Sequence, residues 1–311
     1  MRYELGTSFW ARRLLDRELP VVAPDVLHVH TQGSALLLGD IMRRLPTVIS
    51  ADMTSRRTAE QFTRKGWRWT HGLHHAIEGA ALRKAAALVA FSRYAASSMI
   101  DDYGVDPRKV FVIPPGVDLE SFGDPGAGRA ARDEGVRRIL FVGGEFERKG
   151  GPELITAFLR AFGDRTDVEL HLVTDASAPV PRHPRIVVHA GIGAYTPEWR
   201  ALYEQATLVA LPSRREAYGL VYLEAGAARL PVIGSSVGAG PELVIDGETG
   251  FLVAPGDVAA LAARLRTLVD DRTLARRLGE SARARVERDF DAAKNIERLA
   301  SVFESAAGKG A

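Results

Sequence analysis

Two glutamates, Glu216 and Glu224, stand eight residues apart in a segment that follows an apolar run and opens a helical pattern. Glu216 would lie in the loop at the carboxyl end of a strand, where open α/β sheets bind ligands. The start of the next helix, from Gly219 through Leu220 to Val221, would offer backbone N–H groups and a positive dipole end to an anion. One carboxylate can then hold a ribose diol and the other a sugar hydroxyl. A solvated helix face is the plainer interpretation, but it leaves the flanking Pro-Ser and Tyr-Gly-Leu sequences unexplained.

A glycine-rich loop with two cations forms a second candidate site. Gly143 and Gly144 follow an apolar run, and Arg148 and Lys149 stand just before a helix with proline in its first turn. Glycine lets backbone N–H groups approach an anion, and Arg and Lys supply charge against a diphosphate. The spacing is neither G-x-G-x-x-G nor that of a P-loop, which counts against a Rossmann oxidoreductase. Taken alone, the segment fits a tight turn followed by solvated charges equally well.

The elements that would position these residues are short apolar runs that alternate with helical patterns. Buried strands are predicted at residues 26–30, 47–50, 87–91, 110–113, 138–142, 168–173, 186–189, 208–211, 231–234 and 250–253. Helical spacing is found at residues 34–44, 94–103 and 153–162. Strands separated by helices predict βαβ units, and therefore doubly wound parallel sheets.

The chain has 311 residues, a length that suits two domains. Residues 123–135 are a run of Gly, Pro, Ala and charged residues without apolar periodicity, which is typical of an interdomain linker. We therefore expect one domain over residues 1–122 and a second over residues 136–311. The second would end in helices, and the last residues, from 305 onward, should fray.

Composition excludes several classes of protein. Lys and Arg number 41 against 39 Asp and Glu, so the net charge is +2 and a nucleic-acid partner is not expected. There is no cysteine, which rules out disulfides and thiolate metal sites. The first twenty residues contain no apolar core of a signal peptide, and the longest apolar run, residues 85–91, is too short to cross a bilayer. The expectation is a cytoplasmic protein.

The sequence resembles the group-1 retaining glycosyltransferases of the GT-B fold. The segments that carry this resemblance are residues 212–227, 230–233, 240–244, 246–253 and 255–257, with further similarity at 24–30, 112–118 and 143–150. The resemblance implies two Rossmann-like, doubly wound domains. It also implies a nucleoside diphosphate sugar as donor, a sugar or lipid-linked acceptor, no cofactor and no metal.

The resemblance also implies a role for each matching residue. Glu216 would contact hydroxyls of the donor sugar, and Glu224 would hold the ribose. Lys149, with Arg148 beside it, would neutralise the leaving diphosphate. The remaining donor-binding positions lie on the backbone around the ligand: Gly143 and Gly144 in the first loop, Ile192 against the nucleobase, and Gly219, Leu220 and Val221 at the helix start.

Two positions depart from the family pattern. Where the family usually has Arg after the first glycine, this chain has Gly144, so a phosphate contact is lost or passes to Arg148. Where the family often has His after the second strand present here, this chain has Asp52, which can accept a hydrogen bond from a sugar hydroxyl but cannot replace a neutral imidazole donor. We include Asp52 among the candidate catalytic residues.

The first domain is also shorter than the fold requires, because only 23 residues precede Pro24. Its sheet would lack its first strands and leave an edge to be covered or paired. A late-started gene model or a trimmed chain would explain this shortness. Together with Gly144, the shortness keeps a second hypothesis open, that of a non-catalytic nucleotide-sugar-binding pseudoenzyme.

Three weaker patterns have plain explanations beside the functional ones. Asp289-Phe290-Asp291 follows a long helix and is expected to form a capping turn rather than a metal site. His71, His74 and His75 lack a carboxylate pattern, so solvated or packed histidines are expected. Residues 56–84 are rich in Arg and Lys with Trp67 and Trp69 between them, which suits peripheral contact with the inner face of a membrane or a merely solvated helix.

Overall fold

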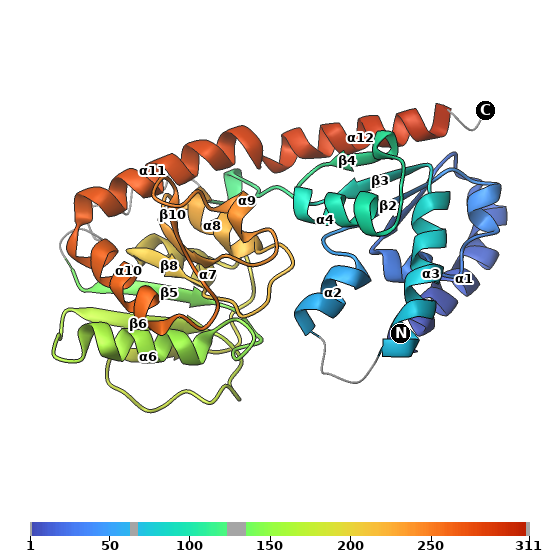
Figure 1. The fold of residues 1–311 in the computed structure, drawn as a ribbon. Helices are drawn as coiled ribbons and strands as arrows, with labels where there is room; N and C mark the ends of the chain where they lie inside the picture. Colours follow the sequence, from blue (N-terminus) through green and yellow to red (C-terminus); the bar gives the residue numbers. More distant parts are fainter. Residues whose placement is uncertain (1, 63–67, 123–134, 309–311) are drawn as a thin grey trace. The chain divides into compact units, whose positions relative to one another are not determined.

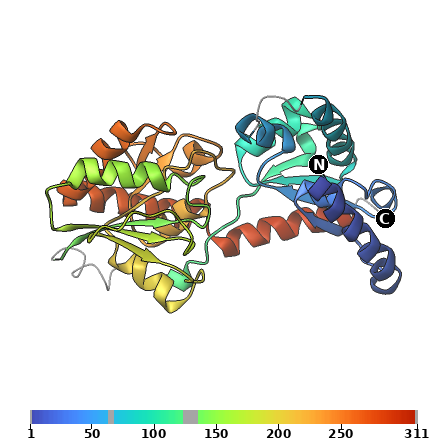
Figure 2. The same ribbon diagram turned by 90° about the horizontal axis from the view of Figure 1, so that it is seen from below.

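The structure is a computed structural model that describes residues 2–62, 68–122 and 135–308. It divides into two compact units, Met1–Pro115 with Lys294–Ala311, and Gly116–Ala293. Each unit is built around its own parallel sheet (Figures 1 and 2). The predicted linker falls almost wholly on residues 123–134, which lie outside the described residues.

The first unit contains a four-stranded parallel sheet in the order β1-β2-β3-β4. Its elements are α1 (Arg2–Val22), β1 (Leu27–His30), β2 (Thr47–Ala51), α2 (Ser55–Phe62), α3 (Arg68–Lys84), β3 (Ala87–Ala90), α4 (Arg93–Ser97), β4 (Val110–Val112) and α12 (Ala292–Gly308). The sequential order fits the prediction of βαβ units. Strand β1 lies at one edge of this sheet.

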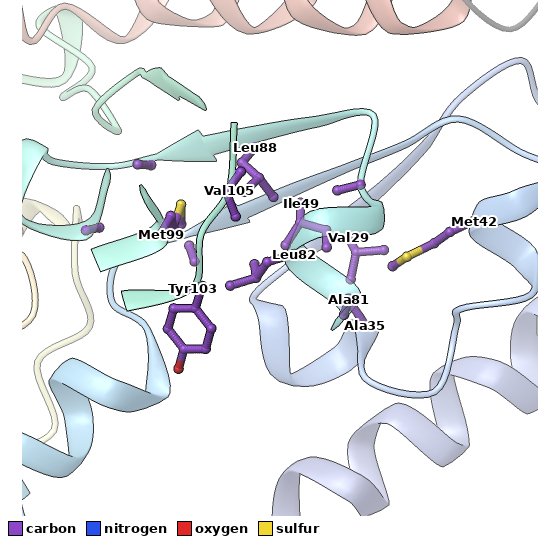
Figure 3. Packing of buried hydrophobic residues seen from close by; sticks show 14 of the residues in the cluster. Val29, Ala35, Met42, Ile49, Ala81, Leu82, Leu88, Met99, Tyr103 and Val105 are labelled. Atoms are coloured by element: carbon purple, nitrogen blue, oxygen red, sulfur yellow. The ribbon is translucent and has the colours of Figure 1, made fainter. Parts of the chain in front are cut away.

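Alternating side chains of these strands pack on two different layers. Val29, Ile49 and Leu88 face Leu82 of α3, as the close view in Figure 3 shows. The neighbouring strand residues Val48 and Val89 instead pack with Val302 and Ala306 of α12. Because successive side chains of a strand point to opposite faces, α3 and α12 cover opposite faces of the sheet, as Figure 1 also shows.

The last helix corrects the predicted domain boundary. Residues 136–311 were expected to form one domain, but Lys294–Ala311 belongs to the first unit and the first boundary lies at Pro115 rather than at 122. The expected fraying from residue 305 is also wrong for the described part, because α12 continues to Gly308 with Ala306 only 3% exposed. An apolar stripe tells which side of a helix is buried, but not which sheet buries it.

The second unit contains a six-stranded parallel sheet in the order β10-β9-β8-β5-β6-β7. The strands are β5 (Arg137–Val142), β6 (Val168–Val173), β7 (Ile186–His189), β8 (Leu208–Ala210), β9 (Val232–Ser235) and β10 (Gly250–Val253). The chain moves outward from β5 to β7, returns to the other side of β5 at β8, and then moves outward to β10. The strand order therefore reverses between β5 and β8, and this is the topological switch point where doubly wound sheets bind ligands.

Helices cover both faces of this sheet. They are α6 (Gly151–Phe162), α7 (Pro197–Gln205), α8 (Leu220–Ala227), α9 (Gly240–Leu243), α10 (Val258–Asp270) and α11 (Arg272–Asp289). Helix α6 packs with α10, and α8 packs with α11, while Figure 2 shows α6 and α7 on opposite sides of the sheet. The predicted apolar stripe of α6 is buried except for Leu159, which is 36% exposed.

All ten predicted strands are present, with ends that differ by no more than one residue. The helical predictions are less accurate. Residues 34–44 form two short 3₁₀ helices, Gln32–Ala35 and Ile41–Arg43, with Gly39 between them, and glycine weakens a helix interior. Residues 94–103 continue from α4 into a π-helical turn at Ser98–Asp102.

Candidate active site in the second unit

Two loops that are far apart in the sequence meet at the switch point. The loop after β5 carries Arg148, and its carbonyl accepts a hydrogen bond from the Arg214 N–H in the loop after β8, at 2.9 Å. Gly150 makes this approach possible: its φ is +81°, and a Cβ atom there would lie only 2.1 Å from the Pro212 carbonyl oxygen. Any larger residue would clash with the second loop and would also be strained in the left-handed region.

This contact brings together Lys149 and Glu216, two of the residues predicted from the sequence. Lys149 Nζ lies 2.5 Å from Glu216 Oε2, and Ser213 Oγ donates to the same oxygen at 3.1 Å. Glu216 is 6% exposed. A Cβ atom on Gly143 would lie 3.0 Å from Lys149 Cγ, so glycine leaves room for the lysine side chain. A buried carboxylate of this kind needs its cation, because an uncompensated buried charge is costly.

Arg148 is held differently from Lys149. Its Nε and Nη2 donate to the two carboxylate oxygens of Glu145 at 2.8 and 2.6 Å, and its Nη1 donates to the Arg215 carbonyl at 2.9 Å. Nη1 also lies 3.9 Å from Glu216 Oε1. The hydrogen bonds with Arg148 lower the pKa of the Glu145 carboxyl. Glu145 therefore offsets much of the Arg148 charge, and Lys149 is the cation closest to Glu216.

The predicted anion-binding helix start is α8. Gly219 precedes the helix in a left-handed conformation with φ +98°, and a Cβ atom there would lie 3.0 Å from the Tyr222 ring. Leu220 and Val221 are the first two residues of α8. The first N–H groups of a helix have no partner within the helix, and they form the positive end of its dipole. The structure thus places a helix start at the predicted residues, and phosphate binding there remains a prediction.

Glu224 lies on the same helix, about one turn from its start at Leu220. Its carboxylate is 6% exposed and accepts hydrogen bonds from two tyrosines, Tyr203 Oη to Oε2 at 2.9 Å and Tyr195 Oη to Oε1 at 3.2 Å. Burial raises the pKa of Glu224, while the two hydroxyls and the charge of Lys149 act in the opposite direction. Sequence reasoning did not find either tyrosine, because no spacing in the sequence links Tyr195 or Tyr203 to Glu224.

The remaining predicted donor-binding residues lie in loops at the same edge of the sheet. Gly144 belongs to the loop after β5, and a Cβ atom there would lie 3.7 Å from Asp175 Oδ2. Gly144, Arg148 and Asp175 help to line a hollow of about 400 Å³. Ile192 follows β7, is half-buried, and lies one residue after Gly191, whose φ is +75°. Its predicted contact with a nucleobase remains a prediction.

Asp52 lies in the other unit and directly follows β2, at the carboxyl end of the first sheet. It is half-buried. Its expected hydrogen bond with a sugar hydroxyl remains a prediction.

The weaker sequence patterns have structural explanations. Asp291 Oδ1 accepts a hydrogen bond from the Ala293 N–H at the start of α12, as expected for a capping turn. His74 Nε2 lies 2.8 Å from Ser55 Oγ, and the His75 ring packs against Tyr103 at 4.2 Å. The side chains of His71 and Trp69, and all of Trp67, lie outside the described residues. Within the described part of the chain, no three His, Asp or Glu side chains are grouped as metal ligands.

Two Rossmann-like units with parallel sheets, and a carboxylate–cation site at the switch point of the second, define a protein of the GT-B class. Residues 136–271 match the family model described as glycosyl transferases group 1, and residues 1–121 match the model described as glycosyltransferase family 4. The chain belongs to the group-1 glycosyltransferases.

Curated relatives agree with this assignment. The chain is 34% identical over 232 residues to an MMP α-(1→4)-mannosyltransferase of Mycolicibacterium hassiacum, a match that covers 72% of this chain and 55% of the relative. It is 31% identical over 283 residues to a glycogen synthase of Mycobacterium tuberculosis, covering 86% of this chain and 66% of that protein. The chain thus spans less than two thirds of the length of these relatives.

Solved structures show the same fold. A sucrose-phosphate synthase from Thermosynechococcus elongatus superposes with a TM-score of 0.80 at 21% identity, over 94% of this chain and 76% of that one. The Anabaena protein HepE, solved in complex with UDP and glucose, superposes with a TM-score of 0.77 at 20% identity, over 95% and 81% of the two chains. Among the helices that the structure describes, none combines the length and apolarity needed to span a bilayer.

Proposed function

We propose that this chain is a retaining glycosyltransferase that moves a sugar from a nucleoside diphosphate sugar to an acceptor hydroxyl. The observation that carries the proposal is the Lys149–Glu216 pair. Helix α8 begins shortly after Glu216, and Glu224 lies one turn into that helix. A cation, a helix start and two carboxylates match the diphosphate, donor sugar and ribose of one such ligand. The Anabaena structure with UDP and glucose supports a ligand of this class in the same fold.

In this proposal Lys149 neutralises the leaving diphosphate while the bond between the anomeric carbon and its phosphate oxygen breaks. Backbone N–H groups of Leu220 and Val221 add to that stabilisation, and each preorganised donor of this kind contributes about 10²–10³ in rate. Glu216 accepts a hydrogen bond from a donor-sugar hydroxyl, and Glu224 accepts from the ribose. Because these cationic and N–H groups supply the positive charge, we propose that no metal ion is required.

The anomeric configuration is retained because the acceptor hydroxyl attacks the anomeric carbon from the same face that the diphosphate leaves. The acceptor oxygen forms the new bond to the anomeric carbon, the phosphate oxygen departs with the bonding electrons, and the acceptor proton passes to that leaving oxygen. No covalent nucleophile is needed in this sequence. Asp52, after β2, would accept a hydrogen bond from a sugar hydroxyl.

The decisive experiment is product analysis with a set of ¹³C-labelled α-linked nucleotide sugars and an added sugar or polyprenol acceptor, followed by NMR. Formation of an α-linked product or α-configured free sugar supports a retaining transferase. An inverted, β-configured product would contradict the mechanism. Tight nucleotide binding without any turnover of any donor would instead favour the pseudoenzyme hypothesis, which the loss of Arg at position 144 motivates.

A lipid-linked acceptor, a cytoplasmic location and contact with the inner membrane face are also proposals. The membrane contact depends on the basic composition of residues 56–84. Two of these cations are already paired in α2, where Arg56 and Arg57 lie 3.2 and 3.0 Å from Glu60. Sedimentation with vesicles of phosphatidylglycerol and phosphatidylcholine tests the contact, and absence of binding at low salt would contradict it.

A further inference from the structure

Tyr195 has a backbone conformation that is unusual for a bulky residue. Its φ is +64°, in the left-handed region that favours glycine. It lies in the connection between β7 and α7, directly before Thr196, whose side chain caps α7 by accepting from the Trp199 N–H at 3.3 Å. Strain of this kind persists only where surrounding contacts hold the residue, and such residues are frequent at binding sites.

Two contacts hold Tyr195. Its ring packs against Trp199 with a centroid separation of 5.0 Å, and Trp199 is itself 2% exposed. Its hydroxyl donates to Glu224 Oε1 at 3.2 Å. Tyr195 remains 41% exposed, whereas Tyr203, the other tyrosine on Glu224, is 1% exposed. Tyr195 is therefore the partner of Glu224 that lies toward solvent.

The Glu224 carboxylate can accept more hydrogen bonds than the two tyrosines donate to it. An ionised carboxylate offers about four acceptor positions, two on each oxygen. Tyr203 uses one position on Oε2 and Tyr195 uses one on Oε1. One position then remains on each oxygen, and a vicinal diol has two hydroxyls that can donate to both.

We propose that Tyr195, together with Tyr203, positions the Glu224 carboxylate to accept both hydroxyls of a ribose, so that the chain selects ribonucleotides over 2′-deoxyribonucleotides. This inference rests on the proposed function and deepens it by naming the structural basis of ribose selection. Tyr195 acts through Glu224 and is a positioning residue. Its strained backbone places the hydroxyl where it fixes Oε1, and Trp199 prevents the ring from moving away.

The same arrangement has a pH-dependent consequence. The groups that face Glu224 are Tyr195 before α7, Tyr203 within α7, and Lys149 from the loop after β5; all three favour the ionised carboxylate, whereas burial raises its pKa. Removing the Tyr195 hydroxyl should raise the pKa of Glu224 further. Only the ionised carboxylate can accept both diol hydrogens, so the variant should lose affinity at a higher pH than the wild-type chain does.

The test compares wild type with Tyr195→Phe, which keeps the ring and its packing on Trp199. Calorimetry would measure the affinities of both chains for UDP, GDP and their 2′-deoxy forms at pH 8 and at pH 5.5. We expect Tyr195→Phe to bind the ribonucleotide about two- to tenfold more weakly, as for the loss of one hydrogen bond. The variant should also prefer the ribonucleotide over the 2′-deoxy form less strongly than wild type does. Its loss of ribonucleotide affinity should be larger at pH 5.5 than at pH 8. Tyr203→Phe should also reduce the preference, which gives a second variant if the first folds poorly.

A matched control is Tyr94→Phe, which removes a phenol hydroxyl that accepts from Gln61 in the first unit and should change none of these quantities. Equal wild-type affinity for ribo- and deoxyribonucleotides would overturn the inference, as would unchanged preference and pH dependence in both tyrosine variants. Failure of the wild-type chain to bind any nucleoside diphosphate is a different result, because it would overturn the proposed function itself.

Discussion

Lys149 Nζ and Glu216 Oε2 lie 2.5 Å apart although their residues are separated by 67 positions in the chain. The contact depends on the adjacency of β5 and β8 at the switch point, since each residue follows one of these strands. The two opposite charges neutralise each other. A ligand that gives a phosphate oxygen to Lys149 and a hydroxyl to Glu216 replaces both interactions at once, which suits a sugar diphosphate better than either part alone.

Lys149→Met should weaken nucleoside diphosphate binding by about 1.5–3 kcal/mol, the range for a hydrogen bond to a charged group. Nucleoside binding should change much less, because the lysine charge acts on phosphate. Calorimetry with UDP, GDP and the corresponding nucleosides measures both, with the exposed Lys84→Met as a control. Equal losses for nucleoside and diphosphate would indicate that Lys149 has only a structural role.

Glu216→Gln should reduce kcat with the donor that the enzyme accepts by about 10²-fold, since it removes a charged acceptor from the donor sugar at the reacting centre. Affinity for the nucleoside diphosphate, which lacks the sugar, should change little. Steady-state kinetics and calorimetry separate these effects. The control Glu145→Gln changes a carboxylate that pairs with Arg148, and it should affect kcat less. A loss of diphosphate affinity as large as the loss of rate would argue against contact with the sugar.

Glu224→Gln should stabilise the fold at neutral pH while weakening ribonucleotide binding. Burial raises the pKa of Glu224 above its ordinary value of 4.5, so the folded state holds the proton more tightly than the unfolded state. The free energy of unfolding should therefore fall as pH rises from about 4.5 through the folded-state pKa. Thermal unfolding at pH 4 and pH 7 checks the sign: the gain from Glu224→Gln should be larger at pH 7. A gain confined to pH 4 would show that the carboxylate is stabilising when ionised.

Gly150→Ala should destabilise the second unit and reduce diphosphate affinity, because the methyl group meets the Pro212 carbonyl at 2.1 Å. Gly256→Ala is the matched control, since its φ of +79° resembles the +81° of Gly150 but nothing lies within 4 Å of the added atom. The control should cost about 1 kcal/mol from backbone strain alone, and Gly150→Ala about 2 kcal/mol or more. Denaturant unfolding gives both values. Equal costs would mean that the two loops separate without penalty.

Val302→Asp should destabilise the first unit by about 3 kcal/mol or more, because it buries an unpaired charge against Val48 and Val89. Ile296→Asp is the control on the same helix, at a side chain 64% exposed. Hydrogen exchange should show lost protection in β2 and β3 and unchanged protection in β5 and β6. Loss confined to the second unit would place α12 there and contradict the structure.

The sequence alone determined the local elements and the chemistry of most candidate residues. Strands such as β3 and β8 are apolar runs that are buried throughout. A run of this kind can be predicted from sequence because a strand covered on both faces needs apolar side chains on both. The segments around Gly143 and Glu216 were found because glycines, cations and a helix start are the groups that bind an anion. The short helices between residues 32 and 43 were not found, because glycine interrupts a pattern that otherwise has helical periodicity.

Only the tertiary structure decided which residues meet. The pairing of Lys149 with Glu216 requires β8 to lie beside β5, and strand order is set by packing of the whole sheet rather than by either segment. The tyrosines on Glu224 approach it from α7 and from the connection before that helix, whose sequence gives no sign of this carboxylate. Helix α12 follows the second unit in the chain but buries Val302 in the first. An apolar stripe specifies that a face must be covered, and the choice of partner depends on which complementary surface folding brings within reach.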